Sequence, residues 1–452
     1  MDQPHTLQEL RSHLPAYGDT AAIIAFAGDA EDTWSFAKLV EVSTRIATGL
    51  IRRGVARGDA VALIAPNSPA WIAAFWAIVA AGAVAVPLDP QIRDDDLARM
   101  LETAGCRWLF TTAAAAGRIA ALAPLCRISI LDSVEAGHDG DAGPELRDAS
   151  PTTVFPLVVP QDTAVIVFTS GTTGTPKAVA LTHANLLANV GALATTRLVG
   201  PGDRALLPLP LYHAYPLTIG MLTPLALGCG IILPSGISGP ELLKALREGS
   251  ATALLGVPRL YTALLENIHR TIAAKARLVA RSIALLLAVA AWAKRHRMSW
   301  PARILLRPLR RTLAPRLRLL VSGGAPISAE VEETLGAMGW EMLTGYGLVE
   351  TASMLTFNPP RAALPGSAGK PVPGMEIRLA NRGPDGIGEI EVRGPSLFSG
   401  YRNDPEKTKE AFTPDGWFRT GDLGRLDSEG FLFITGRLKE MINRGGDRKS
   451  VV

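Results

Sequence analysis

A nine-residue run ending in a lysine is dense in glycine and hydroxyl side chains. It comprises Thr169, Ser170, Gly171, Thr172, Thr173, Gly174, Thr175, Pro176 and Lys177. Glycines let the backbone curl so that its N–H groups converge on an anion, and the hydroxyls and the lysine add donors. The run therefore predicts a phosphate-binding loop. It is not a Walker A loop, because Pro176 and Ala178 stand where that motif needs glycine and a hydroxyl residue. The alternative is a flexible, hydroxyl-rich surface loop.

Further segments carry residues that could do chemistry, and they follow the loop in order. They are LPLPLYHAY (207–215), SGGAP (322–326), GYGLVE (345–350), GD (421–422) and GRLDSEGFLFITGRLKEMINRGG (424–446). Together with SGTTGTPKAVALTHANL (170–186), this series resembles the adenylate-forming (AMP-binding) superfamily, which includes acyl-CoA synthetases, luciferases and peptide-synthetase adenylation domains. The resemblance runs from about residue 7 to 446, and several motifs in a fixed order are far more specific than one loop.

The resemblance implies a nucleotide site. Lys177 and the loop hydroxyls would hold the β- and γ-phosphates of ATP. A flat slot for adenine, with the Tyr346 ring available to stack, would be formed by Gly323, Gly324, Ala325, Pro326, Gly345, Tyr346 and Gly347. The alternative for the tyrosine alone is an ordinary core side chain.

Three charged residues complete the implied site. Glu350 matches the carboxylate that holds Mg²⁺ in the family, and Mg²⁺ commonly takes one or two carboxylates plus phosphate and water. Asp422 matches the acidic residue that accepts both ribose hydroxyls, as an ionised carboxylate can. Arg437 matches an arginine that also contacts ribose. The alternative for each is a surface or turn charge.

Two more positions follow from the same resemblance. His213 would lie between the acyl carboxylate and the substrate pocket, although a lone histidine is as often structural. Lys439 stands at the family's hinge position.

The sequence departs from the family pattern in two places. The family usually has Thr or Ser before the magnesium glutamate, bonding the α-phosphate, whereas this chain has Val349; the neighbouring Thr351 is expected to point elsewhere. Family members also continue past the hinge into a small C-terminal domain that carries a catalytic lysine, whereas this sequence ends at Val452. We expect that domain to be absent and turnover to be slow. A shortened chain, an interrupted gene and a split enzyme with a separate C-terminal partner all remain open.

The implied reaction is ATP-dependent activation of a carboxylic acid. A carboxylate oxygen attacks the α-phosphorus, pyrophosphate leaves, and a thiol, usually CoA, displaces AMP from the acyl-AMP. ATP, Mg²⁺ and CoA as co-substrate are therefore expected. Members with a basic, apolar insertion before SGGAP resemble long-chain fatty-acid–CoA ligases, so a long-chain fatty acid is the predicted substrate, with medium-chain or aryl acids as alternatives. The other functions kept open are a catalytically impaired protein that binds ATP or acyl-AMP, and a ligase that loads a carrier protein.

The charge is concentrated in one segment. Residues 267–329 contain 13 Lys or Arg and no Asp or Glu, within a chain of net charge +4. The apolar run 283–293 lies among these cations and is too short to span a bilayer. It predicts either peripheral contact of 270–318 with an anionic membrane or a helix packed on its own domain. Nucleic acid is not expected, because no aromatic or zinc-knuckle motif accompanies the charge.

The elements that must position these residues read as an α/β protein. Helical and strand patterns alternate over 34–90, and short apolar strands are expected at 164–168, 205–208, 229–233, 251–255 and 317–321. The run 220–230 could line an acyl groove or lie in the core. The fold implied by the resemblance is a large N-terminal domain (1–436) of two helix-flanked mixed sheets, with a β-rich sub-domain at about 365–436 and a hinge at 437–452.

Composition agrees with a compact protein. The 452 residues are 48% hydrophobic and 19% charged, which excludes a disordered chain. Cys106, Cys126 and Cys229 are far apart, so neither a disulfide framework nor a zinc site is expected, and a reducing compartment fits. No signal peptide is recognisable at the start. We expect a cytoplasmic protein, and the membrane interpretation of 270–318 would add peripheral contact at the inner face of the membrane.

Overall fold

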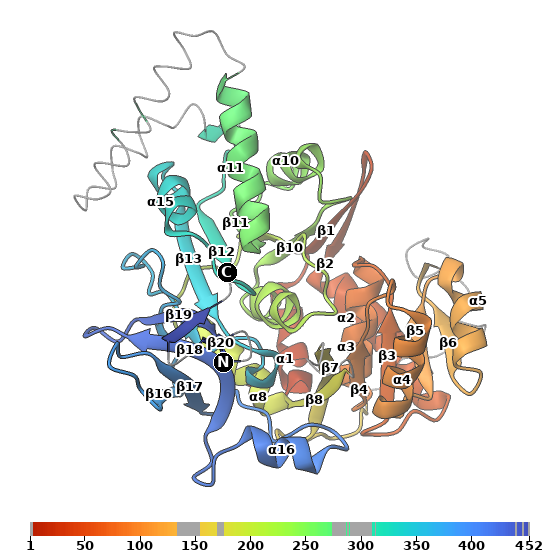
Figure 1. The fold of residues 1–452 in the computed structure, drawn as a ribbon. Helices are drawn as coiled ribbons and strands as arrows, with labels where there is room; N and C mark the ends of the chain where they lie inside the picture. The colour runs from red at the N-terminus through yellow and green to blue at the C-terminus, as the bar shows by residue number, and fades with distance from the viewer. Residues whose placement is uncertain are drawn as a thin grey trace.

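The computed structural model describes residues 3–132, 154–169, 176–273, 310–311, 313–438, 441–444 and 447–450, with two isolated residues at 286 and 289. Several predictions fall outside these residues: the loop residues 170–175, the apolar run 283–293 apart from two positions, most of the basic segment, and Lys439. Figure 1 shows a layered α/β molecule in which two large sheets and one small sheet converge on a common centre.

A six-stranded sheet is built by the first part of the chain. Its strands follow the spatial order β6-β5-β3-β4-β7-β8 and are all parallel except the β7–β8 pair. They are β3 (Ala60–Ile64), β4 (Val84–Pro87), β5 (Trp108–Thr111), β6 (Arg127–Ile130), β7 (Thr163–Thr169) and β8 (Lys177–Thr182). Strand β8 was not expected from the sequence, which predicted only a loop followed by a helix. Its antiparallel pairing returns the chain to the start of β7, where helix α8 begins.

A nine-stranded mixed sheet forms the second layer. Its order is β15-β14-β13-β12-β11-β9-β10-β1-β2, with a parallel centre and antiparallel edges. The strands are β1 (Ala21–Ala27), β2 (Ala30–Ser35), β9 (Arg204–Leu206), β10 (Gly230–Leu233), β11 (Ala253–Gly256), β12 (Leu319–Ser322), β13 (Glu341–Tyr346), β14 (Thr356–Phe357) and β15 (Lys370–Pro371). The central strands β9 to β12 are almost wholly buried, as expected for parallel strands covered on both faces.

A small antiparallel sheet follows in the order β16-β17-β18-β19. Its strands are β16 (Glu376–Ala380), β17 (Gly388–Arg393), β18 (Phe418–Leu426) and β19 (Leu432–Arg437), and the hairpin β20 (Met441–Arg444) with β21 (Asp447–Ser450) comes after it. The expected fold class, two helix-flanked mixed sheets and a smaller β sheet, is confirmed. The domain boundaries stay a prediction.

Helices cover the large sheets, and their starts follow local sequence signals. They are α1 (Leu7–His13), α2 (Phe36–Arg52), α3 (Pro69–Ala80), α4 (Asp94–Ala104), α5 (Ala113–Leu122), α8 (His183–Ala194), α9 (Thr223–Ala226), α10 (Gly239–Glu248), α11 (Pro258–Ala273), α15 (Ala329–Ala337) and α16 (Pro405–Ala411), with short helical turns η1 (Leu14–Tyr17), η2 (Pro216–Leu222) and η3 (Val349–Thr351). Ser68 caps α3 by accepting the Trp71 N–H at 3.1 Å. Thr182 and Asn185 form a capping box at α8.

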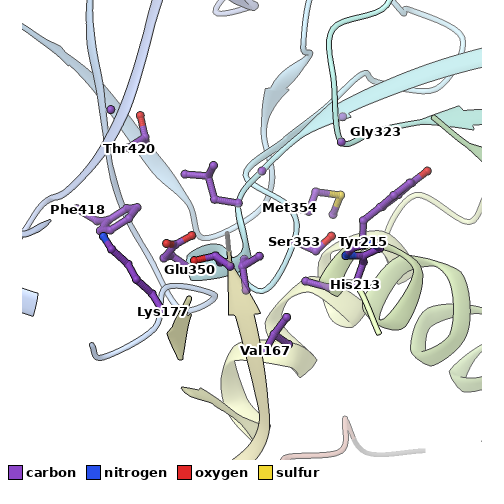
Figure 2. Close-up of a pocket in the computed structure, with 18 of the residues that line it drawn as sticks. Val167, Lys177, His213, Tyr215, Gly323, Glu350, Ser353, Met354, Phe418 and Thr420 are labelled. Atoms are coloured by element: carbon purple, nitrogen blue, oxygen red, sulfur yellow. The ribbon is translucent and has the colours of Figure 1, made fainter. Parts of the chain in front are cut away.

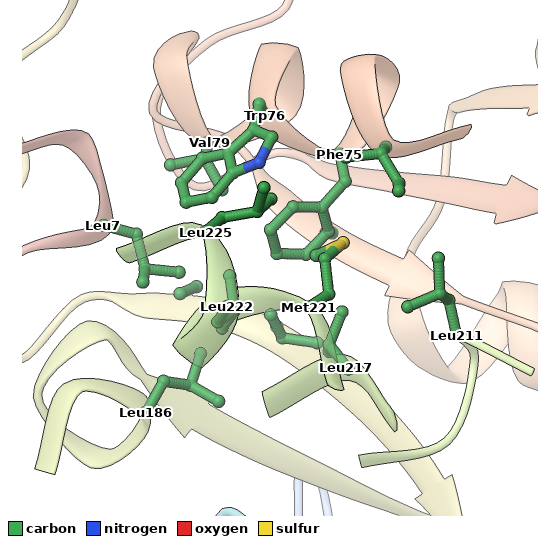
Figure 3. Close-up of a cluster of buried hydrophobic side chains, with 14 of the residues drawn as sticks. Leu7, Phe75, Trp76, Val79, Leu186, Leu211, Leu217, Met221, Leu222 and Leu225 are labelled. Carbon is green, nitrogen blue, oxygen red and sulfur yellow. The ribbon is translucent and has the colours of Figure 1, made fainter. Parts of the chain in front are cut away.

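The main core lies between α3 and the η2–α9 segment. Every residue of α3 is buried, and Phe75 and Trp76 face Leu222 and Leu225 across it (Figure 3). Residues 220–226 belong to this core, and none of the run 220–230 lines either cavity described below. The structure therefore favours the core interpretation of this run over the acyl-groove interpretation. In the part of the chain that the structure describes, no helix is long and apolar enough to cross a membrane.

Candidate active site

A cleft of about 1220 Å³ lies where the three sheets meet. Its walls come from the carboxyl ends of the parallel strands β7, β12 and β13, from β8, and from β18 and β19 of the small sheet. Ligands of open α/β sheets typically bind at the carboxyl ends of strands. Figure 2 shows Lys177 and Glu350 on one side of this cleft, and His213, Tyr215, Ser353 and Met354 on the other.

Both ends of the predicted phosphate loop line the cleft. Thr169 ends β7 and Lys177 begins β8, and the two residues pair directly in the antiparallel ladder. The intervening loop residues 170–175 lie outside the described residues. The Lys177 ammonium lies 4.4 Å from the centroid of the Tyr401 ring, a cation–π distance. The sequence placed this lysine correctly on the cleft but did not identify Tyr401 as its neighbour.

Glu350 lies on the short turn η3, directly after β13. Its backbone C=O accepts the Phe398 N–H at 2.8 Å, and its Oε1 accepts the Tyr401 hydroxyl at 2.9 Å. From α8, Asn189 donates to the carbonyls of Thr351 and Ala352, at 3.0 and 2.8 Å. The carboxylate is thus fixed from two directions. Asn189 was missed by the sequence analysis, although it follows the signature segment by only three residues.

The two residues beside Glu350 lie as the sequence predicted. Val349 lines the cleft with an apolar side chain. Thr351 is fully buried, and its hydroxyl both donates to the Leu348 carbonyl and accepts the Leu348 N–H, each at 3.0 Å. The Thr351 hydroxyl therefore turns away from the cleft and does not replace the one missing at Val349.

Asp422 and Arg437 meet across the small sheet. They are direct partners in the β18–β19 register, and Arg437 Nε donates to Asp422 Oδ1 at 2.7 Å. The Tyr346 hydroxyl donates to the other oxygen, Oδ2, also at 2.7 Å. Burial, followed by the nearby carboxylate, raises the pKa of Tyr346 well above its usual value, so this hydroxyl remains a donor. Asp422 is 5% exposed and does not line the cleft, whereas Arg437 does, so Arg437 stands between this carboxylate and the open space.

The expected adenine slot is only partly reproduced. Gly323, Gly324, Gly345 and Gly347 line the cleft, but Ala325 and Pro326 are exposed and do not line it. The chain turns outward after Gly324, whose φ of 81° favours glycine. Tyr346 is likewise absent from the lining, because its hydroxyl is directed to Asp422.

Glycine is required at Gly347 for a steric reason. A Cβ there would lie 2.1 Å from the Ser353 carbonyl oxygen, which no backbone adjustment of a few tenths of an ångström relieves. The aromatic residue on this wall is instead Tyr215, whose ring lies 3.2 Å from a Cβ built on Gly323. Its hydroxyl donates to the Val321 carbonyl at 3.1 Å. Tyr215 belongs to the LPLPLYHAY segment, so the same motif that suggested His213 could have identified it.

His213 lies exposed on the lining of the cleft, beside Tyr212. Partial desolvation lowers the pKa of His213, while the Asp89 carboxylate opposes that shift. The ring is therefore largely neutral at pH 7 and can accept or donate one hydrogen bond.

Two serines on the cleft wall were missed by the sequence analysis. Ser322, at the end of β12, and Ser353, after η3, both line the cleft, and their hydroxyls are buried without a hydrogen-bond partner in the described part of the chain. Buried polar groups are normally satisfied, so these two hydroxyls are exceptions beside the cleft. No sequence motif distinguished them from ordinary serines.

A second, apolar cavity of about 490 Å³ adjoins the cleft. The two spaces share Leu209, Pro210 and Val257 as lining residues. The rest of the cavity is enclosed mainly by leucines of α10 and α11, among them Leu242, Leu243, Leu246, Leu260 and Leu264. Apolar ligand pockets commonly have volumes of roughly 300–1,000 Å³.

A magnesium site can be judged from the donors present. Among the described residues no group of three or more His, Cys, Asp or Glu side chains could hold a metal ion by itself. Glu350 offers one carboxylate on the wall of the cleft, on the same side as Lys177. That donor set fits a cation such as Mg²⁺, which is usually completed by phosphate oxygens and water.

Comparison with known proteins agrees with the fold and the cleft. The family profile described as "AMP-binding enzyme" matches residues 10–402. The chain is 32% identical to the long-chain-fatty-acid–CoA ligase FadD15 of Mycobacterium bovis, over 92% of this chain and 72% of that protein. It is 34% identical to the feruloyl-CoA synthase of Amycolatopsis sp., over 91% of this chain and 75% of that protein.

Solved structures show the same architecture. ATP-bound MatB from Rhodopseudomonas palustris is 28% identical with a TM-score of 0.80, covering 98% of this chain and 81% of that one. The N-terminal domain of FACL13 from Mycobacterium tuberculosis is 25% identical with a TM-score of 0.75, covering 95% and 99%. The chain therefore belongs to the AMP-binding enzyme family, and the two relatives named here are a CoA ligase and a CoA synthase.

Proposed function

We propose that this chain activates a long-chain fatty acid with ATP, forming acyl-AMP and releasing pyrophosphate, and that CoA then accepts the acyl group. The observation that carries the proposal is the junction of a polar cleft, lined by Lys177 and Glu350, with an apolar cavity. One space suits a nucleotide and the other a hydrocarbon chain. The acid would lie with its carboxylate at the shared boundary.

The polar cleft supports the first half-reaction. Lys177 would neutralise the β- and γ-phosphates, and Asp422 with Arg437 would hold the ribose. Bound Mg²⁺, held by Glu350, would supply positive charge to the phosphates. Such chemistry depends on positioning and charge neutralisation, so these side chains need to be held in fixed positions around the nucleotide. The contacts of Glu350 and Asp422 to neighbouring segments support that requirement.

The apolar cavity supports the choice of acid. The similar proteins named above act on a long-chain fatty acid and on a feruloyl group, and others among the relatives are described as oxalate and sulfoacetate ligases. A small dianion such as oxalate would leave a leucine-lined space of this size unfilled. Burying apolar surface is worth about 0.8 kcal/mol per CH₂ group, so a long acyl chain gains most from it.

The deciding experiment is ATP–pyrophosphate exchange with palmitate, decanoate, ferulate, oxalate and sulfoacetate. We expect palmitate to give the highest rate. Lys177→Ala should reduce the rate by about 10²–10³-fold, as loss of one preorganised charge does. Lys38→Ala is a matched control, because Lys38 also lies 4.4 Å from an aromatic centroid, that of Trp34, but does not line the cleft. Faster exchange with oxalate than with palmitate would refute the long-chain assignment.

A second candidate is a nucleotide-binding protein that needs a separate C-terminal partner. Val349, which removes a hydroxyl from the cleft, favours it. ATP binding without acid-dependent exchange would support this candidate, and adding a separately made C-terminal domain would then restore exchange.

If exchange occurs, comparing CoA with an acyl carrier protein as acceptor identifies the second half-reaction. The proposed membrane contact through 270–318 is tested by co-sedimentation with anionic vesicles.

A further inference from the structure

Tyr401 joins the two charged groups on which the cleft depends. Its hydroxyl donates to Glu350 Oε1 at 2.9 Å, and its ring centroid lies 4.4 Å from the Lys177 ammonium. The side chain itself is 9% exposed and lines the cleft. One residue therefore contacts a carboxylate through its edge and a cation through its face, which suits the polarity of a phenol ring.

The backbone around Tyr401 is attached to both partners. Val179 and Tyr401 form an antiparallel bridge, and the Arg402 N–H donates to the Ala178 carbonyl at 2.9 Å, so the segment is tied to β8 just after Lys177. Three residues before Tyr401, the Phe398 N–H donates to the Glu350 carbonyl. This segment thus contacts both the lysine strand and the glutamate turn.

Additional contacts hold the segment in place. From α8, Asn185 donates to the carbonyls of Pro395 and Leu397, at 2.8 and 2.9 Å. The Tyr401 N–H donates to Thr408 Oγ1 at 2.9 Å. The Phe398 ring packs edge-on against Tyr401 with centroids 4.9 Å apart. With the ring and backbone both restrained, the hydroxyl has little freedom to leave Glu350.

We propose that Tyr401 is a positioning residue, which orients the Glu350 carboxylate for the divalent cation and holds the Lys177 ammonium beside it before the nucleotide binds. This inference rests on the function proposed above. It predicts two separable effects, because the Tyr401 hydroxyl contacts Glu350 and the Tyr401 ring contacts Lys177. If the Tyr401 side chain only filled space, Tyr401→Phe would bind ATP and Mg²⁺ as the unmodified chain does.

The test is ATP binding by calorimetry, without divalent cation and across a Mg²⁺ titration. For Tyr401→Phe we expect metal-free ATP affinity within twofold of the unmodified chain. The Mg²⁺ concentration that gives half of the metal-dependent gain should rise about tenfold, as loss of a hydrogen bond to a charged group predicts. Tyr17→Phe is the control, because it removes a hydroxyl that bonds the Ala226 carbonyl at 3.0 Å away from the cleft.

A second variant isolates the ring. Tyr401→Leu should show the same loss in Mg²⁺ dependence and also bind metal-free ATP about 2- to 5-fold more weakly, the size expected for a lost cation–π contact. If Tyr401→Leu does not fold, the hydroxyl remains testable in a double-mutant cycle: the change in Mg²⁺ dependence caused by Tyr401→Phe should disappear when Glu350 is already replaced by glutamine.

The outcomes separate this inference from the proposed function. An unchanged or lower Mg²⁺ requirement in Tyr401→Phe overturns the positioning role, while Mg²⁺-dependent ATP binding by the unmodified chain still supports the nucleotide site. If the unmodified chain binds no ATP, the proposed function itself fails.

Discussion

The core beneath α3 and the polar cleft are built on different principles. In the core, Phe75, Trp76, Leu222 and their neighbours are apolar and fully buried (Figure 3). In the cleft, each charged group is held by a partner that is distant in the sequence: Glu350 by Tyr401, and Asp422 by Tyr346. The core needs residues of the right kind and size, whereas the cleft needs particular pairs. Substitutions should therefore affect stability in one region and binding in the other.

The largest expected effect is on the core. Phe75→Ala should lower the free energy of unfolding by about 3–5 kcal/mol, because it removes buried surface and leaves a cavity. Denaturant unfolding measures this change. Leu125→Ala is the control, since Leu125 is 92% exposed and its truncation should stay within about 0.5 kcal/mol. Nucleotide affinity of the folded Phe75→Ala protein should be unchanged, and a large loss of affinity would break the proposed division between the two regions.

His183 is a polar exception inside the core and provides the next largest effect. It is 1% exposed, and its Nδ1 accepts the Leu7 N–H at 3.1 Å. Burial lowers the pKa of His183 from 6.5 to about 4, against smaller opposing effects of Asp162 and Glu9. Between these pH values the unfolded chain binds a proton that the folded chain does not. The free energy of unfolding therefore falls as the pH drops from 6.5 to 4, by about 3 kcal/mol in all.

Urea unfolding at several pH values between 7 and 4 checks this prediction. His183→Gln keeps a hydrogen-bonding side chain but cannot titrate, so its stability should fall less over the same window. Parallel pH curves for the two proteins would show that His183 does not titrate as its burial requires.

The smallest expected effect comes from making the same substitution, valine to threonine, once in the core and once in the cleft. Val165→Thr places a hydroxyl at a fully buried position of β7 and should cost about 1–3 kcal/mol of stability. Val349→Thr places the same group on the cleft wall, where the family resemblance puts an α-phosphate contact. It should leave stability nearly unchanged and speed exchange about 2- to 10-fold, the value of one hydrogen bond. Slower exchange in Val349→Thr would show that this hydroxyl has no role in the chain.

Much of the fold could be predicted because short-range patterns of apolar and capping residues indicate helices and strands. The alternation of helical and strand patterns predicted over 34–90 corresponds to α2 (Phe36–Arg52), β3 (Ala60–Ile64), α3 (Pro69–Ala80) and β4 (Val84–Pro87). Periodicity and caps act over a few residues, so the sequence displays them directly. Strand β8 was missed because its residues, KAVALT, lie between a loop signal and a helix cap, and only pairing with β7 makes them a strand.

The candidate site was predicted in part. The resemblance led to Lys177, Glu350 and Arg437, which line one cleft, and to Asp422, which is buried behind the lining and bonds Arg437. Their roles stay predictions. It also suggested Ala325 and Pro326, which the turn after Gly324 directs to the surface.

The sequence by itself determined which residue types were available: a glycine- and hydroxyl-rich loop, a lysine, and separated carboxylates in a fixed order. Only the tertiary structure decided which of them meet. Tyr401 reaches Glu350 across 51 positions of the chain, and Tyr346 reaches Asp422 across 76. Such contacts depend on how sheets and helices pack. No local pattern of residues encodes them, because hydrogen bonds and cation–π contacts are decided by distances of a few ångströms in space.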